Sequence, residues 1–107
     1  MDKIIKIKGD IIMIGKYCII RSGKAGVFAG ILTEKNGQEV RMKDCRRIWY
    51  WEGAASISQI ANEGVKAPKD CKFSVSVSDI TIMDVIEIIP CTEKAEKNIR
   101  EVPEWRI

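Results

Sequence analysis

Residues 27–51 read VFAGILTEKNGQEVRMKDCRRIWYW, and this stretch decides the fold around which the rest of the chain must be arranged. Two runs rich in strand-forming residues, 27–35 and 39–51, flank the dipeptide Asn36-Gly37. Asn-Gly is the strongest short hairpin signal, because a type I′ turn needs positive φ at both central residues. The stretch therefore predicts a β-hairpin.

Side chains alternate between the two faces of a strand, so the register of this hairpin sorts its residues into faces. A two-residue turn at the Asn-Gly pair joins Val40 to Thr33 and Met42 to Ile31 across the hairpin. The expected core face then holds Val27, Ala29 and Ile31 from the first strand and Val40, Met42, Asp44, Arg46, Ile48 and Tyr50 from the second.

The opposite face combines aromatic and basic side chains, with Gly30 leaving room beside them. Its members are Phe28, Gly30 and Leu32 from the first strand and Arg41, Lys43, Cys45, Arg47, Trp49 and Trp51 from the second. Arg46 and Arg47 must point to opposite faces. We therefore expect Arg47 to contact a ligand and Arg46 to support the structure or a subunit contact.

The run from residue 41 to residue 51 holds two of the three tryptophans, one of the two tyrosines and four basic side chains. Indole and guanidinium planes stack on nucleobases, and guanidinium groups hold phosphates through paired hydrogen bonds. The run indicates a site for a phosphorylated or base-containing ligand. The alternative is a core strand anchored by tryptophan, with solvated arginines. Phe73 has the same two interpretations, as a core residue or as a stacking platform.

The other segments predict an α+β fold, mainly an antiparallel sheet with a small barrel-like or sandwich core and one or two short helices. Strands are expected at residues 3–8, 17–21, 72–78 and 80–89. Helices are expected at residues 53–64, capped by Ser56, and at residues 93–100, capped by Thr92. At 107 residues, we expect a single domain spanning residues 1–107.

Composition excludes several classes of function. The net charge of +3 is mild for a nucleic-acid-binding protein, so nucleic acid is an unlikely partner. The chain has no histidine, and its four cysteines form no Cys-x-x-Cys pair, so we expect no metal, no cofactor and no enzyme activity. No signal peptide or membrane-spanning stretch is visible, which favours the cytoplasm.

The loop Ser22-Gly23-Lys24-Ala25-Gly26 follows a predicted strand and is basic. Its backbone amides could form a nest for an anion. The alternative is a plain connecting turn. The loop is not a P-loop, because its spacing differs and a strand follows it.

Several short motifs occur in an order typical of one family. They are Arg-Ser at residues 21–22, Ala-Gly-Val-Phe-Ala-Gly at 25–30, Gly-x-Glu-Val at 37–40, Arg-Arg-Ile-Trp-Tyr-Trp-Glu-Gly-Ala at 46–54, Cys-Lys-Phe at 71–73 and Ile-Glu-Ile at 86–88. The pattern covers residues 17–91 and resembles the first type of Thoeris anti-defence protein, a group of small phage proteins. The Arg-Arg-x-Trp-x-Trp-x-Gly-Ala run is its most specific part.

The resemblance implies a phage protein that acts in the cytoplasm of the infected bacterium. Such proteins bind a cyclic ADP-ribose isomer, made as an immune signal by a TIR enzyme, and sequester it without cleaving it. Some members also capture the cyclic oligonucleotides of CBASS defence. They form dimers or larger homo-oligomers with ligand pockets between subunits.

Aromatic and arginine side chains carry the binding in that family. The matching positions in this sequence are Arg21, Phe28, Arg46, Arg47, Trp49, Trp51 and Phe73, with Arg100 as a weaker match from the C-terminal part. Lys24 departs from the family pattern, in which the glycine loop is less basic, and this bears on ligand preference.

Two alternatives remain. The first is a small protein-interaction module that inhibits a host protein directly, with the tryptophans as interface anchors. The second is a small barrel that binds single-stranded nucleic acid. The mild net charge argues against the second.

Overall fold

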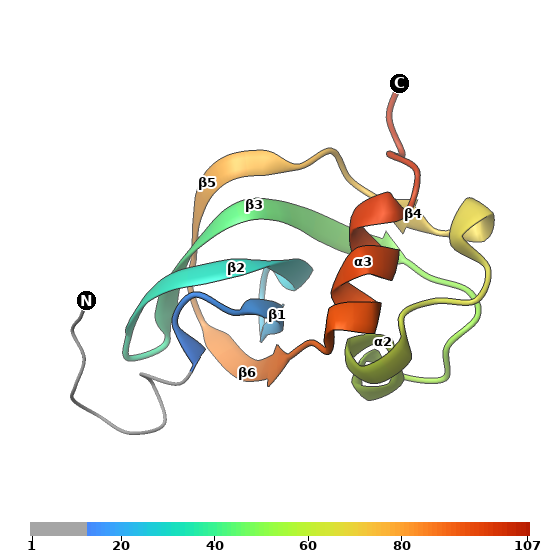
Figure 1. Ribbon diagram of the computed structural model, residues 1–107. Coiled ribbons are helices and arrows are strands. Elements are labelled where there is room, and N and C mark those ends of the chain that lie inside the picture. Colours follow the sequence, from blue (N-terminus) through green and yellow to red (C-terminus); the bar gives the residue numbers. More distant parts are fainter. Residues whose placement is uncertain (1–12) are drawn as a thin grey trace.

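The computed structural model describes residues 13–107 and confirms the predicted α+β architecture. Within this part, six strands pair antiparallel in one sheet (Figure 1). One short helix comes after the third strand in the chain, and another comes after the sixth. The strands are β1 (Tyr17–Ser22), β2 (Gly26–Asn36), β3 (Glu39–Tyr50), β4 (Lys72–Phe73), β5 (Val77–Ile82) and β6 (Val85–Pro90). The helices are α2 (Ile57–Glu63) and α3 (Glu93–Glu101), with a 3₁₀ turn η1 (Pro68–Asp70) between α2 and β4.

The sheet is strongly curled. Its order is β6-β1-β2-β3, and the free edge of β3 pairs with β5 along its first half and with β4 near its end. β5 and β6 therefore lie at opposite edges, yet only Met83 and Asp84 connect them. Such a short connection requires the two edges to approach each other at that end, as Figure 1 shows.

Curling divides the apolar residues into two cores. The inner core lies between the strands and consists of Cys18, Ile20, Phe28, Leu32, Val40, Met42, Cys45, Ile82 and Val85. The outer core lies between the sheet and the two helices and consists of Tyr17, Ile19, Ala29, Ile48, Ile60, Ala61, Val65, Cys71, Phe73, Ala95, Ile99 and Val102. β1 is buried on both faces, because alternate residues enter different cores.

The hairpin forms where it was predicted, but the predicted register is wrong. Asn36 pairs with Glu39, so the turn residues are Gly37 and Gln38. Gly37 has φ of 64°, whereas neither Asn36 nor Gln38 has positive φ. Positive φ at the first central residue alone fits a type II′ turn, which favours glycine there, so the turn moves one residue along the chain.

The predicted common face of Met42 and Ile48 is also wrong, because a β-bulge lies between them. Asp44 has φ of 47°, and Asp44 and Cys45 together oppose Gly30. The extra residue reverses the alternation, so that Met42 enters the inner core and Ile48 the outer core. The room that was expected beside Gly30 on the tryptophan face is instead filled by the bulge, since a β-carbon on Gly30 would lie 2.8 Å from the α-carbon of Cys45.

Both predicted helices are confirmed with their caps. The Ser56 hydroxyl accepts a hydrogen bond from the backbone N–H of Gln59 at 3.2 Å, and Thr92 caps α3 in the same way through Ala95 at 3.0 Å. Gly64 ends α2 with φ of 79°. No helix in residues 13–107 is both long and apolar enough to cross a membrane.

The predicted strands 72–78 and 80–89 are wrong in extent. Residues 74–76 leave the sheet, so the first becomes β4 and the start of β5, and Asp84, with φ of 58°, turns the chain between β5 and β6. Pro90 belongs to β6 rather than stopping it, which an edge strand tolerates. The strand predicted at residues 3–8 lies outside the described residues.

Replacing Gly30 with alanine should lower the free energy of unfolding by about 1–3 kcal/mol, the usual cost of overpacking. The new β-carbon would meet backbone atoms of Cys45 and Lys43, which the sheet holds in place. Urea denaturation followed by tryptophan fluorescence measures the loss. Gly23→Ala is the matched control, because its β-carbon would meet the Asp84 carboxylate, which can rotate away. Equal losses in the two variants would contradict the bulge argument.

Candidate functional site

The eight side chains that the sequence singles out do not form one site. Arg47 and Trp49 lie on an exposed part of β3, and Arg100 lines a small pocket near α3. The others are buried, folded onto the core or paired elsewhere on the surface. These are Phe28, Arg46, Phe73, Trp51 and Arg21.

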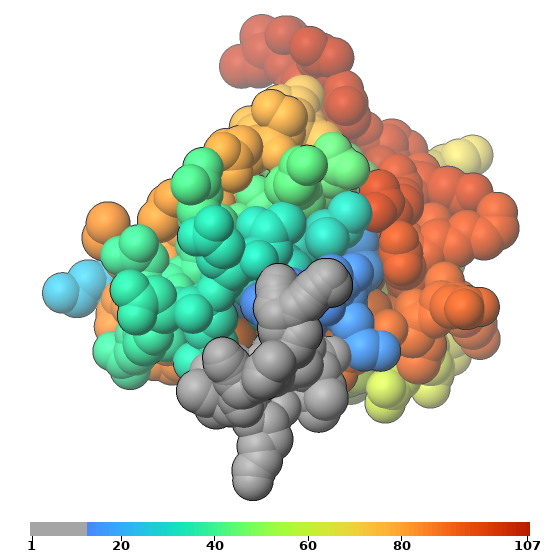
Figure 2. Space-filling model, turned by 60° about the vertical axis from the view of Figure 1, so that its left-hand side comes forward, coloured from blue at the N-terminus to red at the C-terminus, as the bar shows by residue number. Residues whose placement is uncertain are grey.

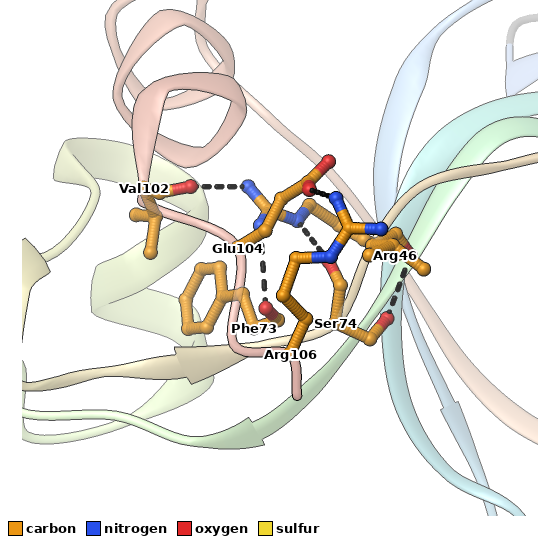
Figure 3. Close-up of polar contacts among 7 residues, drawn as sticks. Arg46, Phe73, Ser74, Val102, Glu104 and Arg106 are labelled. Atoms are coloured by element: carbon orange, nitrogen blue, oxygen red, sulfur yellow. Dashed lines mark hydrogen bonds and ion pairs between the residues drawn. The ribbon is translucent and has the colours of Figure 1, made fainter.

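Arg46 is buried, with only 5% of its surface exposed, and its guanidinium donates to four backbone carbonyls. Nε donates to Ser74 at 2.9 Å, Nη1 donates to Ile99 at 2.9 Å and Val102 at 2.8 Å, and Nη2 donates to Phe73 at 3.3 Å. Figure 3 shows this group between the end of α3 and the chain after β4. The expectation that Arg46 faces the core side is confirmed.

Burial lowers the pKa of the Arg46 guanidinium from its ordinary value, but four carbonyl partners and the ring of Phe73, 5.5 Å away, compensate for the lost water. Two of these carbonyls belong to the last turn of α3, where a positive charge is favourable. Arg46 therefore closes the C-terminal end of α3 and fixes the position of residues 73 and 74.

Arg47 points away from this network and is exposed. Its guanidinium carbon lies 4.6 Å from the centre of the Phe28 ring, and Nη1 donates to the carbonyl of Ala25 at 3.2 Å. Trp49 lies two residues further along β3, where the pairing with β4 shifts register, and is 66% exposed. We call Lys24, Ala25, Arg47 and Trp49 the Arg47–Trp49 surface. It joins the glycine loop to the arginine–tryptophan strand.

Backbone amides of the glycine loop already have acceptors. The Ser22 hydroxyl accepts from the N–H groups of Lys24 and Ala25, and the N–H of Gly23 donates to Asp84. The same hydroxyl donates to the carbonyl of Met83 at 2.8 Å. This loop therefore holds the β5–β6 corner, which favours the connecting-turn interpretation over an anion nest. Its contribution to a site is the exposed Lys24 side chain.

Three other predicted residues have structural contacts. Trp51 packs on the outer core, and its indole N–H donates to the carbonyl of Ala54 at 3.1 Å. Arg21 forms an ion pair with Glu87 at 2.9 Å. Phe73 is fully buried, which agrees with its interpretation as a core residue. Phe28 is also buried, so it can support Arg47 but offers little ring surface to a ligand.

A pocket of about 110 Å³ opens beside the C-terminal end of α3. Tyr17, Asp44, Arg46, Ser76, Arg100 and Glu104 contribute to its wall, and we call it the Tyr17–Arg100 pocket. The guanidinium carbon of Arg100 lies 4.7 Å from the centre of the Tyr17 ring, while its Nε donates to Glu96 at 2.9 Å. Burial raises the pKa of Tyr17 well above its ordinary value, so its hydroxyl stays protonated.

Sequence reasoning missed Tyr17 and Asp44. Tyr17 looked like an ordinary strand residue, and Asp44 was assigned to the core face. The sequence would have predicted Asp44 at the pocket only if it had indicated the bulge, for example through an aspartate opposite Gly30. No local signal brings Tyr17 to Arg100, because they are far apart in the chain.

The cysteines are poor nucleophiles. Burial raises the pKa of the Cys18 thiol to about 11 and that of the Cys45 and Cys91 thiols to about 12. The charge of Arg47 opposes the rise in the pKa of Cys45 but does not overcome it. A thiol that stays protonated at neutral pH is a weak attacking group. Among residues 13–107, no group of three potential metal ligands comes together.

Residues 15–99 match a family model described as a domain of unknown function, DUF6948. The chain belongs to this family. The match spans β1 to α3, so the DUF6948 domain includes the Arg47–Trp49 surface and all the strands of the sheet. Glu104 and Trp105 follow the matched region. Neither the curated proteins nor the solved structures compared with the chain gave a match.

Arg46 and Arg47 should differ sharply in their effect on stability. Arg46→Ala leaves the carbonyls of Ser74 and Val102 without their donor, while those of Phe73 and Ile99 keep a backbone N–H. We expect it to lower the free energy of unfolding by about 2–6 kcal/mol, given roughly 1–3 kcal/mol for each unsatisfied buried group. Arg47→Ala removes an exposed contact and should change it by about 1 kcal/mol or less. Thermal and urea melts of both variants test this. Similar losses would contradict the separate roles.

Proposed function

We propose that this protein binds and sequesters a small phosphorylated ligand that carries a nucleobase, without cleaving it. The most specific candidate is a cyclic nucleotide immune signal, a cyclic ADP-ribose isomer made by a TIR enzyme, as the resemblance to Thoeris anti-defence proteins implies. Cyclic oligonucleotides are a related ligand class. The observation that carries the proposal is the Arg47–Trp49 surface, where two motifs distant in sequence meet.

The geometry of Arg47 suits a phosphate. Its guanidinium is held between the Phe28 ring and the Ala25 carbonyl, and only one of its N–H groups donates to another described residue. A held guanidinium loses less side-chain entropy when an anion binds. Lys24 adds a second positive charge from the neighbouring loop.

The exposure of Trp49 suits a base. Large aromatic side chains usually bury most of their surface, whereas this indole leaves 66% exposed. A nucleobase stacked on it would contribute about 1–3 kcal/mol. A phosphate held by Arg47 lies within the reach of the same ligand, because only Ile48 separates the two exposed residues along β3.

One such surface is too small for tight capture. One stacked base and two charge-assisted contacts supply about 4–9 kcal/mol before the cost of association, while nanomolar binding needs about 12 kcal/mol net. Two surfaces facing each other would double the contacts. This arithmetic supports a homo-oligomer with its ligand between subunits, as the resemblance implies.

Protein interaction is the second candidate function. Trp105 is 51% exposed, with Lys72 Nζ 5.2 Å from the centre of its ring, and Ile107 is fully exposed. These C-terminal residues, dark red in Figure 2, project from one end of the molecule and lie outside the family match. They could anchor a host protein. In that case Trp105→Ala would abolish capture of the host protein, and Trp49→Ala would not.

Arg47→Ala should weaken binding of the cyclic ADP-ribose isomer by about 1.5–3 kcal/mol, the range for a lost charge-assisted contact, and leave the melting temperature nearly unchanged. Isothermal titration calorimetry measures the affinity. Arg41→Ala is the matched control, since Arg41 is another exposed arginine of β3 that pairs with Asp79. If both variants bind like the unsubstituted protein, the Arg47–Trp49 surface is not the site.

The bound signal should be released intact by heating, and the protein should be a dimer or larger in solution. Mass spectrometry of the released ligand and light scattering of the protein test these outcomes. A linear product would reveal cleavage. A monomer at micromolar concentration, with and without ligand, would contradict capture between subunits.

A further inference from the structure

The Tyr17 side chain is buried, and its hydroxyl has no hydrogen-bond partner among residues 13–107. Tyr17 is 5% exposed and lines the Tyr17–Arg100 pocket, but its hydroxyl bonds to none of the described residues. A buried polar group left unsatisfied costs roughly 1–3 kcal/mol, so such groups almost always have a partner. A partner from outside the chain would therefore have to enter the pocket.

Other groups around this pocket have hydrogen-bonding capacity that no described residue uses, and three of them, Asp44, Arg100 and Glu104, are exposed to solvent. Arg46 uses four of its five N–H groups on carbonyls, and Arg100 bonds through Nε alone. Asp44 forms no bond to any described residue, and Glu104 uses one oxygen, on Arg106. Donors and acceptors thus line one pocket without pairing with each other.

Charge at the pocket is balanced. Two guanidinium groups face two carboxylates, and the carbonyl end of α3 adds partial negative charge. Both carboxylates would repel an anion, and both arginines would repel a cation. A neutral ligand that both donates and accepts hydrogen bonds could instead bond to the arginines and to the carboxylates.

Hydroxyl groups have this property, since each donates one hydrogen bond and accepts two. We infer that the Tyr17–Arg100 pocket binds the vicinal diol of a sugar ring such as ribose. Asp44 and Glu104 accept from the hydroxyls, in the way that a carboxylate holds ribose in dinucleotide-binding folds. Tyr17 and Arg100 donate to them. The pocket, at about 110 Å³, has room for one ring and not for a whole nucleotide.

The inference stands apart from the proposed function. Arg46 and Arg47 are neighbours that point to opposite faces of β3, so the pocket and the Arg47–Trp49 surface lie on different sides of the strand. The pocket can therefore bind a diol even if the Arg47–Trp49 surface does not bind the cyclic nucleotide signal, and the surface can bind the signal even if the pocket binds no diol.

The test is a ¹⁵N NMR titration of the full chain with adenosine, with 2′,3′-dideoxyadenosine as the ligand lacking the diol. Adenosine should shift amides at residues 17, 44, 76 and 102, and the dideoxy analogue should not. Tyr17→Phe should weaken adenosine binding about three- to tenfold, as expected for one lost hydrogen bond. Tyr50→Phe is the matched control, because its hydroxyl bonds to Glu52 on the exposed surface.

Two further measurements separate a ligand role from a structural one. Tyr17→Phe should not lower the melting temperature, since its hydroxyl has no partner in the protein. Asp44→Asn should also weaken adenosine binding, while retaining a residue that tolerates positive φ. Equal shifts with both ligands, no shifts at the pocket, or unchanged binding by Tyr17→Phe would overturn the inference.

Discussion

One guanidinium group joins the parts of this fold that the backbone alone does not connect. Arg46 comes from the middle of β3, yet it donates to carbonyls that follow β4 and that end α3 (Figure 3). Arg46 is almost fully buried, and two of these carbonyls also accept backbone N–H groups, Phe73 from Trp105 and Ile99 from Val102. The four bonds therefore tie β3 to the C-terminal end of α3 and to residues 73 and 74.

The burial of Arg46 also determines what its neighbour can do. Because side chains alternate along a strand, fixing Arg46 on the helix side leaves Arg47 on the other face, where it rests on Phe28 and reaches the glycine loop. The structural and the candidate binding arginine are thus adjacent in sequence but separated by the sheet. A small domain can in this way carry an exposed basic and aromatic surface while its core stays closed.

Local features were predictable because their causes are local. Ser56 and Thr92 cap helices by reaching amides three residues away, and Gly64 ends a helix through its own backbone freedom. The position of the hairpin followed from Asn36 and Gly37 for the same reason. The candidate site was predictable in part: alternation separates Arg46 from Arg47, but nothing local shows that Phe28 and Phe73 are buried.

The sequence by itself determined the fold class, the hairpin, both helices and the opposite orientations of the two arginines, because propensity, capping and alternation act over a few residues. Tertiary structure alone decided the bulge in β3, the break after Phe73 and the meeting of Tyr17 with Arg100. The bulge at Asp44 exists because Gly30, on another strand, leaves space for Cys45. At the break after Phe73, the Phe73 carbonyl accepts from two residues distant in sequence, the Trp105 N–H at 2.8 Å and Arg46 at 3.3 Å. Contacts between residues far apart in the chain depend on how the whole sheet curls, and no short window of sequence contains that information.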